Sequence, residues 1–148
     1  MTQSLPSKHL VIYADDDQDD VELVRDSFEK YAQNVELVSF EDGNHALQFL
    51  TRLAKEDTTP CLIILDINLP GVDGKELLKA IRDMDHYQDT PVVLFTTSSQ
   101  PTDKSFARNL SAGFMTKPLS FKQMDIITDQ FIEHCADDIK KKIRKQLG

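Results

Sequence analysis

The chain is 148 residues long and has a formal net charge of −8, with 25 acidic residues against 17 basic ones. This length predicts one domain over residues 1–148, large enough to bury a core without disulfides or a structural metal. The acidic balance argues against nucleic-acid binding, which relies on clustered Lys and Arg. No apolar run suits a signal peptide or a membrane span, so we expect a cytoplasmic protein that does not contact the membrane.

Two cysteines, Cys61 and Cys135, lie far apart in the chain, without a CxxC spacing or partnering histidines. This pattern indicates neither a disulfide framework nor a zinc site. We expect both residues to be buried thiols in a reducing cytosol.

Apolar runs alternate with amphipathic stretches along the chain. In chain order, the patterns predict a strand at 10–14, a helix around 21–31, a strand at 35–40, a helix around 46–53, a strand at 62–65, a helix around 77–84, a strand at 92–95, a helix at about 102–111, a strand at 114–116 and a helix from about 120 to 131. Five strands alternating with five helices predict a three-layer α/β sandwich with a parallel sheet. We place the core at about 8–134 and a C-terminal helical extension at 135–148.

Two helical segments differ from the others in their apolar patterns. The fourth helix has only Phe106, Ala107 and Leu110 as an apolar stripe, so we expect it to be held loosely. The C-terminal stretch 135–148 either extends the fifth helix or forms a separate helix that begins at an acidic cap, Asp137 or Asp138. Its apolar residues can pack back on the domain or extend a binding surface; they are Ile139, Ile143 and Leu147.

Polar side chains follow four of the predicted strands, at their carboxyl ends. They are Asp15 and Asp16, Asp66, Thr96 and Lys117. Right-handed crossovers bring these ends to one rim of a parallel sheet, where α/β folds keep their sites. Three facing carboxylates are unfavourable unless a hard divalent cation such as Mg²⁺ lies between them. A lysine and a hydroxyl beside them suit a phosphoryl group, and an aspartate can be the nucleophile that accepts it.

These motifs occur together in one order. They are the acidic pair Asp15-Asp16, Asp66 within LDINLPGVDG, Thr96 in LFTTS, and Lys117-Pro118 in GFMTKP. In that order and at those separations, the chain resembles a two-component response-regulator receiver domain of the chemotaxis-regulator type over about 10–131. The resemblance implies a flavodoxin-like fold with strand order 2-1-3-4-5.

The resemblance also implies roles for the residues at the rim. Asp66 would accept a phosphoryl group from a phosphohistidine. Asp15 and Asp16 would hold Mg²⁺ together with Asp66 and the backbone carbonyl of Asn68. Lys117 would pair with Asp66 at rest and with the phosphoryl oxygens afterwards.

Further roles implied by the family concern the switch and the loops around it. Thr96 would move toward the phosphoryl group, and Phe114 would turn inward to fill the space that Thr96 leaves. The Lys117-Pro118 peptide bond would be cis. We expect Asp17 to cap the first helix in preference to joining the metal cluster.

Two residues, Asn68 and Ser98, flank the expected path of attacking water, and neither is an acid or base suited to activate it. We therefore expect slow autodephosphorylation. Under this interpretation the protein is not an enzyme, beyond catalysing its own phosphorylation and dephosphorylation.

The partners implied are a sensor histidine kinase or histidine phosphotransfer protein, a downstream protein target, and a second copy of the chain in a homodimer. By family analogy, the fourth helix, fifth strand and fifth helix form the face that binds the target. The TTSS run and the link before the third strand resemble the single-domain subclass associated with phytochrome-type kinases.

The sequence can be interpreted in three other ways. A haloacid-dehalogenase-type phosphatase needs an acid where Asn68 stands. A flavodoxin-like cofactor binder needs a phosphate loop, whereas the acidic loop at 15–20 would repel phosphate. A phosphorylation-independent adaptor of the same fold stays open.

Overall fold

The computed structural model describes residues 8–117 and 121–145, except for the side chains of 121–125. The strands are β1 (His9–Ala14), β2 (Val35–Phe40), β3 (Leu62–Leu65), β4 (Val92–Thr96) and β5 (Gly113–Thr116). The helices are α1 (Gln18–Phe28), α2 (Gly43–Lys55), α3 (Gly74–Asp83), α4 (Pro101–Asn109), α5 (Phe121–Glu133) and α6 (Asp137–Arg144). Two short 3₁₀ helices, Glu29–Tyr31 and Asp85–Tyr87, follow α1 and α3.

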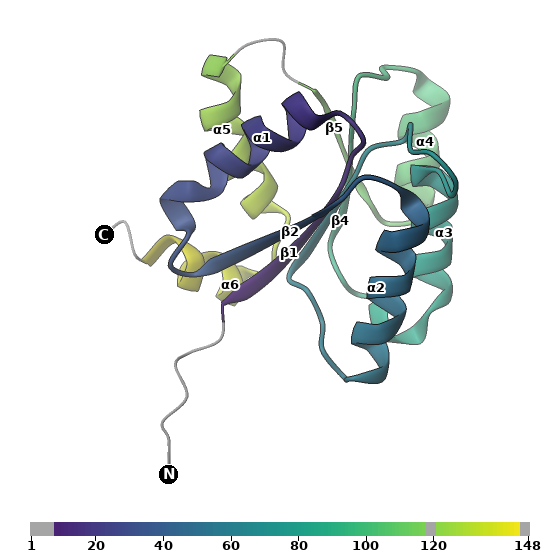
Figure 1. Ribbon diagram of the computed structural model, residues 1–148, viewed down its shortest axis with the longest axis horizontal. Helices are drawn as coiled ribbons and strands as arrows, with labels where there is room; N and C mark the ends of the chain where they lie inside the picture. The colour runs from purple at the N-terminus through teal and green to yellow at the C-terminus, as the bar shows by residue number, and fades with distance from the viewer. Residues whose placement is uncertain (1–7, 118–120, 146–148) are drawn as a thin grey trace.

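The five strands form one parallel sheet in the order β2-β1-β3-β4-β5. Helices α1, α5 and α6 cover one face of this sheet, and α2, α3 and α4 cover the other (Figure 1). The predicted three-layer sandwich and its strand order are confirmed, with α6 as a sixth helix. All strands run the same way, so their carboxyl ends lie along one rim.

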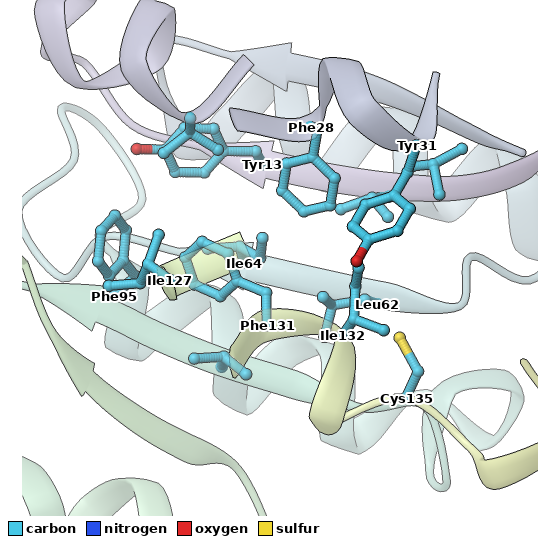
Figure 2. Close-up of a cluster of buried hydrophobic side chains, with 14 of the residues drawn as sticks. Tyr13, Phe28, Tyr31, Leu62, Ile64, Phe95, Ile127, Phe131, Ile132 and Cys135 are labelled. Atoms are coloured by element: carbon cyan, nitrogen blue, oxygen red, sulfur yellow. The ribbon is translucent and has the colours of Figure 1, made fainter. Parts of the chain in front are cut away.

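The core has two parts because alternate residues of a strand point to opposite faces of the sheet. The cluster between the sheet and α1, α5 and α6, which we call the first cluster, contains Tyr13, Phe28, Phe95 and Phe131 (Figure 2). The Phe95 and Phe131 rings meet edge to face, with their centroids 5.0 Å apart. The second cluster packs α2, α3 and α4 on the other face. Both parts hold the central strands rigidly beneath the rim.

Helix α1 begins where the acidic loop ends. The carboxylate of Asp17 accepts hydrogen bonds from the backbone N–H groups of Asp19 and Asp20, at 3.0 and 3.2 Å. Asp17 is the N-cap of α1, as predicted.

The C-terminal extension forms a separate helix, α6. Its N-cap position is Ala136, which makes no side-chain capping bond, and Asp137 and Asp138 lie in its first turn. The prediction that one of these acids caps the helix was therefore wrong; both acids instead favour its N-terminus through the helix dipole. Ile143 is fully buried in the first cluster and Ile139 packs against it, so the helix packs back on its own domain. Leu147 lies outside the described residues.

Helix α4 buries few residues. Ala107 and Asp103 are buried, while Phe106 and Leu110 are only partly covered. Its contact with the domain is thus partly polar. Across the described ranges, no helix combines the length and the apolar character that a bilayer crossing requires.

Candidate functional site

The parallel register places the predicted site residues beside one another. Ala14 of β1 pairs with Leu65 of β3, and the backbone N–H of Asp66 donates to the carbonyl of Ala14 at 2.9 Å. Asp15 and Asp66 are therefore the first residues beyond two neighbouring strands. On the other side, the N–H of Lys117 donates to the carbonyl of Thr96 at 2.8 Å. Hydrogen bonds of the sheet thus position all four residues.

Three carboxylates, those of Asp15, Asp16 and Asp66, each offer one oxygen within 4.8 Å of the other two. Asp15 and Asp66 are buried, whereas Asp16 is exposed. Burial raises the pKa of Asp15, against the lowering effect of its hydrogen bonds with Lys117 and Tyr13. An all-oxygen, negatively charged set of this kind fits a hard divalent cation, which would neutralise it.

Lys117 lies at the centre of the acidic site. Its Nζ is 2.8 Å from Asp66 Oδ2, 2.8 Å from Asp15 Oδ2 and 2.7 Å from Asp20 Oδ2. Only 9% of the residue is exposed. Burial lowers the pKa of Lys117, but the hydrogen bonds with the three carboxylates outweigh burial and raise it above its ordinary value. Lys117 is therefore a fixed positive charge beside Asp66.

Two contacts of this site were not predicted. Asp20 was predicted only as part of the acidic loop at 15–20, yet it reaches Lys117. Tyr13 was counted only as a strand residue, yet its hydroxyl donates to Asp15 Oδ2 at 2.5 Å. A sequence signal existed for Tyr13, since it stands two residues before Asp15 and so points to the same face of the sheet.

The hydroxyl of Thr96 lies at the carboxyl end of β4 and is fully buried. Its Oγ1 accepts a hydrogen bond from the N–H of Ser98 at 3.4 Å. The Ser98 hydroxyl in turn donates to Asp103 Oδ2 at 2.5 Å, and Lys75 of α3 forms an ion pair with the other oxygen of Asp103. A polar chain therefore runs from Thr96 to α4 and α3. Neither Asp103 nor Lys75 was predicted as a site residue.

The remaining predicted residues lie around this group. The N–H of Asn68 donates to Asp66 Oδ1 at 3.3 Å, so the loop after β3 folds over the carboxylate. Phe114 on β5 is partly buried beside the second cluster, and Lys104 Nζ lies 5.9 Å from the centre of its ring. Pro118 and its peptide bond lie outside the described residues.

Comparisons with known proteins identify the family of this chain. Residues 11–128 match the family model of the response regulator receiver domain. The response regulator Rcp1 of Synechocystis sp. is 30% identical over 125 residues, which cover 82% of this chain and 84% of Rcp1. The structure of the Mn(2+)-bound form of Rcp1 has a TM-score of 0.73 at 30% identity and covers 82% of this chain and 92% of that one.

The fold is also shared with a more distant structure. The phosphorylated cyanobacterial phytochrome response regulator RcpA has a TM-score of 0.77 at 24% identity, covering 88% of this chain and 98% of that one. The family match covers the second cluster, most of the first cluster and the rim that carries the acidic site. The chain belongs to the response regulator receiver domain family, whose members are phosphoacceptors of two-component signalling.

Proposed function

We propose that Asp66 is the residue of this chain that accepts the phosphoryl group. A carboxylate oxygen of Asp66 would attack the phosphorus of a phosphohistidine, so that an O–P bond forms and the N–P bond breaks. The observation that carries this assignment is the 2.8 Å contact between Asp66 Oδ2 and Lys117 Nζ in a buried acidic site. The lysine would hold the Asp66 side chain in place for attack.

Lys117 and Thr96 are the residues that would receive the new phosphoryl oxygens. Lys117 keeps its charge because its pKa is raised, so it can pair with the phosphoryl group in place of Asp66. Thr96 would leave the bond from Ser98 and donate its hydroxyl to the phosphoryl group. Phe114 would then turn inward toward the space beside β4.

A divalent cation, which we propose to be Mg²⁺, completes the site. Asp15, Asp16 and Asp66 would hold it together with the backbone carbonyl of Asn68, and their spacing within 4.8 Å supports this ligand set. When bound, the cation supplies charge neutralisation for the transferring group. The Mn(2+)-bound form of Rcp1 supports a divalent ion in a related protein.

The phosphorylated state is proposed to persist. Ser98 donates its hydroxyl to Asp103, and Asn68 carries no acid or base, so neither residue activates water. We therefore propose slow autodephosphorylation and no activity on other substrates. The phosphoryl group would therefore stay on the protein long enough to carry a signal.

The partners are proposed by class. The donor would be a histidine kinase or a histidine phosphotransfer protein; the phytochrome response regulator RcpA, which shares the fold, supports a phytochrome-type kinase. The output would be a contact of α4, β5 and α5 with a target protein or a second copy of the chain. Ile126 of α5 is 60% exposed and would offer an apolar contact to such a partner. We propose that this occurs in the cytoplasm.

The proposed function is tested by intact mass after incubation with acetyl phosphate. Wild type should gain one phosphoryl group with Mg²⁺ and gain none with a chelator. Asp66→Asn should gain none, whereas Asp17→Asn should behave as wild type, because Asn caps a helix as well as Asp. A wild type that never gains mass would instead favour the phosphorylation-independent adaptor.

A further inference from the structure

The two cysteines of the chain meet at the rim opposite the acidic site. Cys61 directly precedes β3, and Cys135 lies between α5 and α6. Cys135 is buried in the first cluster, and Cys61 is partly buried against the same cluster. Figure 2 shows Cys135 in the same cluster as Leu62, the residue that follows Cys61. Both are free thiols.

The two thiols shift each other's pKa in opposite directions. A hydrogen bond with Cys135, and then burial, raise the pKa of Cys61. The same bond lowers the pKa of Cys135, as do Lys140 and Arg144 of α6, while burial opposes them. A thiolate next to a second thiol is the arrangement from which a disulfide forms.

A small oxidant can reach Cys61 from solvent. Cys61 lines a pocket of about 630 Å³ at the amino ends of the strands. Leu10 and Pro60 also line it, as do Ala136, the residue after Cys135, and Ile139 of α6. The pocket therefore lies next to both Cys61 and the segment that carries Cys135.

We propose that Cys61 and Cys135 form a reversible intramolecular disulfide when the protein meets a peroxide. One sulfur attacks hydrogen peroxide, so the O–O bond breaks, a sulfenic acid forms and one water leaves. The second sulfur attacks the sulfenic sulfur, so the S–S bond forms and a second water leaves. The two thiols lose two electrons and two protons, and the peroxide gains them.

This modification is separate from phosphorylation. Cys61 precedes β3 and Asp66 follows it, so the two chemistries lie at opposite ends of the same strand. The disulfide would join the start of β3 to the α5–α6 junction and constrain the unfolded chain. We expect oxidised protein to unfold at a higher temperature and still to accept a phosphoryl group, so this inference can fail without affecting the proposed function.

The test is peroxide treatment of the full chain followed by alkylation and mass spectrometry without reductant. Wild type should lose two hydrogens, resist alkylation and give one peptide pair that links Cys61 to Cys135, all reversed by dithiothreitol. Cys61→Ser and Cys135→Ser should each keep one thiol and give no internal link.

A second measurement uses wild type alone, so it does not depend on how the variants fold. Internal disulfide formation should be at least about tenfold faster in folded protein than in urea, because the fold holds the sulfurs together. Equal rates, sulfinic acid on one cysteine without a link, or only intermolecular disulfides would overturn the proposal.

Discussion

Lys117 Nζ lies 2.7 Å from Asp20 Oδ2, so the first turn of α1 shares the ammonium group that contacts Asp66. Asp20 is outside the group of three acids that can surround a cation. It therefore holds Lys117 without competing for the metal. Lys117 therefore has two roles. It neutralises the acids of the site, and it assists phosphoryl transfer.

Lys117→Met should lower the free energy of unfolding by about 3 kcal/mol in a chelator. The reason is that the buried carboxylates of Asp15 and Asp66 lose the lysine ammonium group that neutralises them. Mg²⁺ should restore part of this loss. Asp20→Asn should cost less than about 1 kcal/mol, because Asp20 is partly exposed. Urea unfolding measures both. Phosphoryl uptake should fall severely in Lys117→Met and only a few-fold in Asp20→Asn; equal loss in both variants would contradict this division.

Asp15→Asn should stabilise the metal-free protein. Burial raises the pKa of Asp15, so its ionised form is unfavourable in the folded state, and an amide removes that cost. The same change removes a ligand of the proposed cation. Thermal unfolding should show a higher Tm in a chelator and a much smaller rise in Tm when Mg²⁺ is added. A lower metal-free Tm with an undiminished Mg²⁺ response would show that Asp15 has neither role.

Asp103→Asn should weaken the contact of α4 with α3. The ion pair with Lys75 and the Ser98 hydroxyl lower the pKa of Asp103 below 3.8, so the folded state binds fewer protons than the unfolded state. This stabilisation is present above about pH 4 and is lost as pH falls through the lowered pKa. The variant should lose about 1–2 kcal/mol at pH 7 and much less at acid pH. Asp26→Asn, on the exposed side of α1, is the control.

The measurement for Asp103 is urea unfolding from neutral to acid pH. A difference from wild type that stays constant across this range would mean that ionisation of Asp103 does not stabilise the fold. A difference as large in the Asp26→Asn control would mean that the effect is not specific to α4.

Gly74→Ala should destabilise the protein by about 2 kcal/mol, although Ala is the better helix former. A Cβ at Gly74 would lie 2.0 Å from the carbonyl oxygen of Asp66, so the loop after β3 would have to move. Lys79→Ala in the same helix should cost little, because Lys79 is exposed. Chemical denaturation of both variants measures the difference. Equal stability of the two variants would show that the close approach is not needed.

The elements of this fold were largely predictable, because each strand is a short apolar run and each helix has an apolar stripe. Asp17 was also predictable as a cap, since capping is a local property. The start of α6 could not be predicted, because in the sequence the two acids of its first turn look like N-cap residues. The acids at the strand ends could be predicted to form one site, because a parallel sheet brings those ends together.

The contacts that sequence could not predict depend on side chains from distant elements. Asp20 and Lys117 meet because a long lysine side chain at the end of β5 reaches the start of α1. Cys61 and Cys135 come close only through the path of α5 across the sheet. No spacing in the chain encodes either contact.

The central claim is that Asp66 is the side chain that becomes phosphorylated, and borohydride trapping tests it most directly. Protein treated with acetyl phosphate and Mg²⁺ is reduced with borohydride, which converts an aspartyl phosphate to homoserine, and its peptides are sequenced by mass spectrometry. We predict homoserine at position 66 alone, and none when a chelator replaces Mg²⁺. Homoserine at Asp15 or Asp16, or unmodified peptides throughout, would contradict the account.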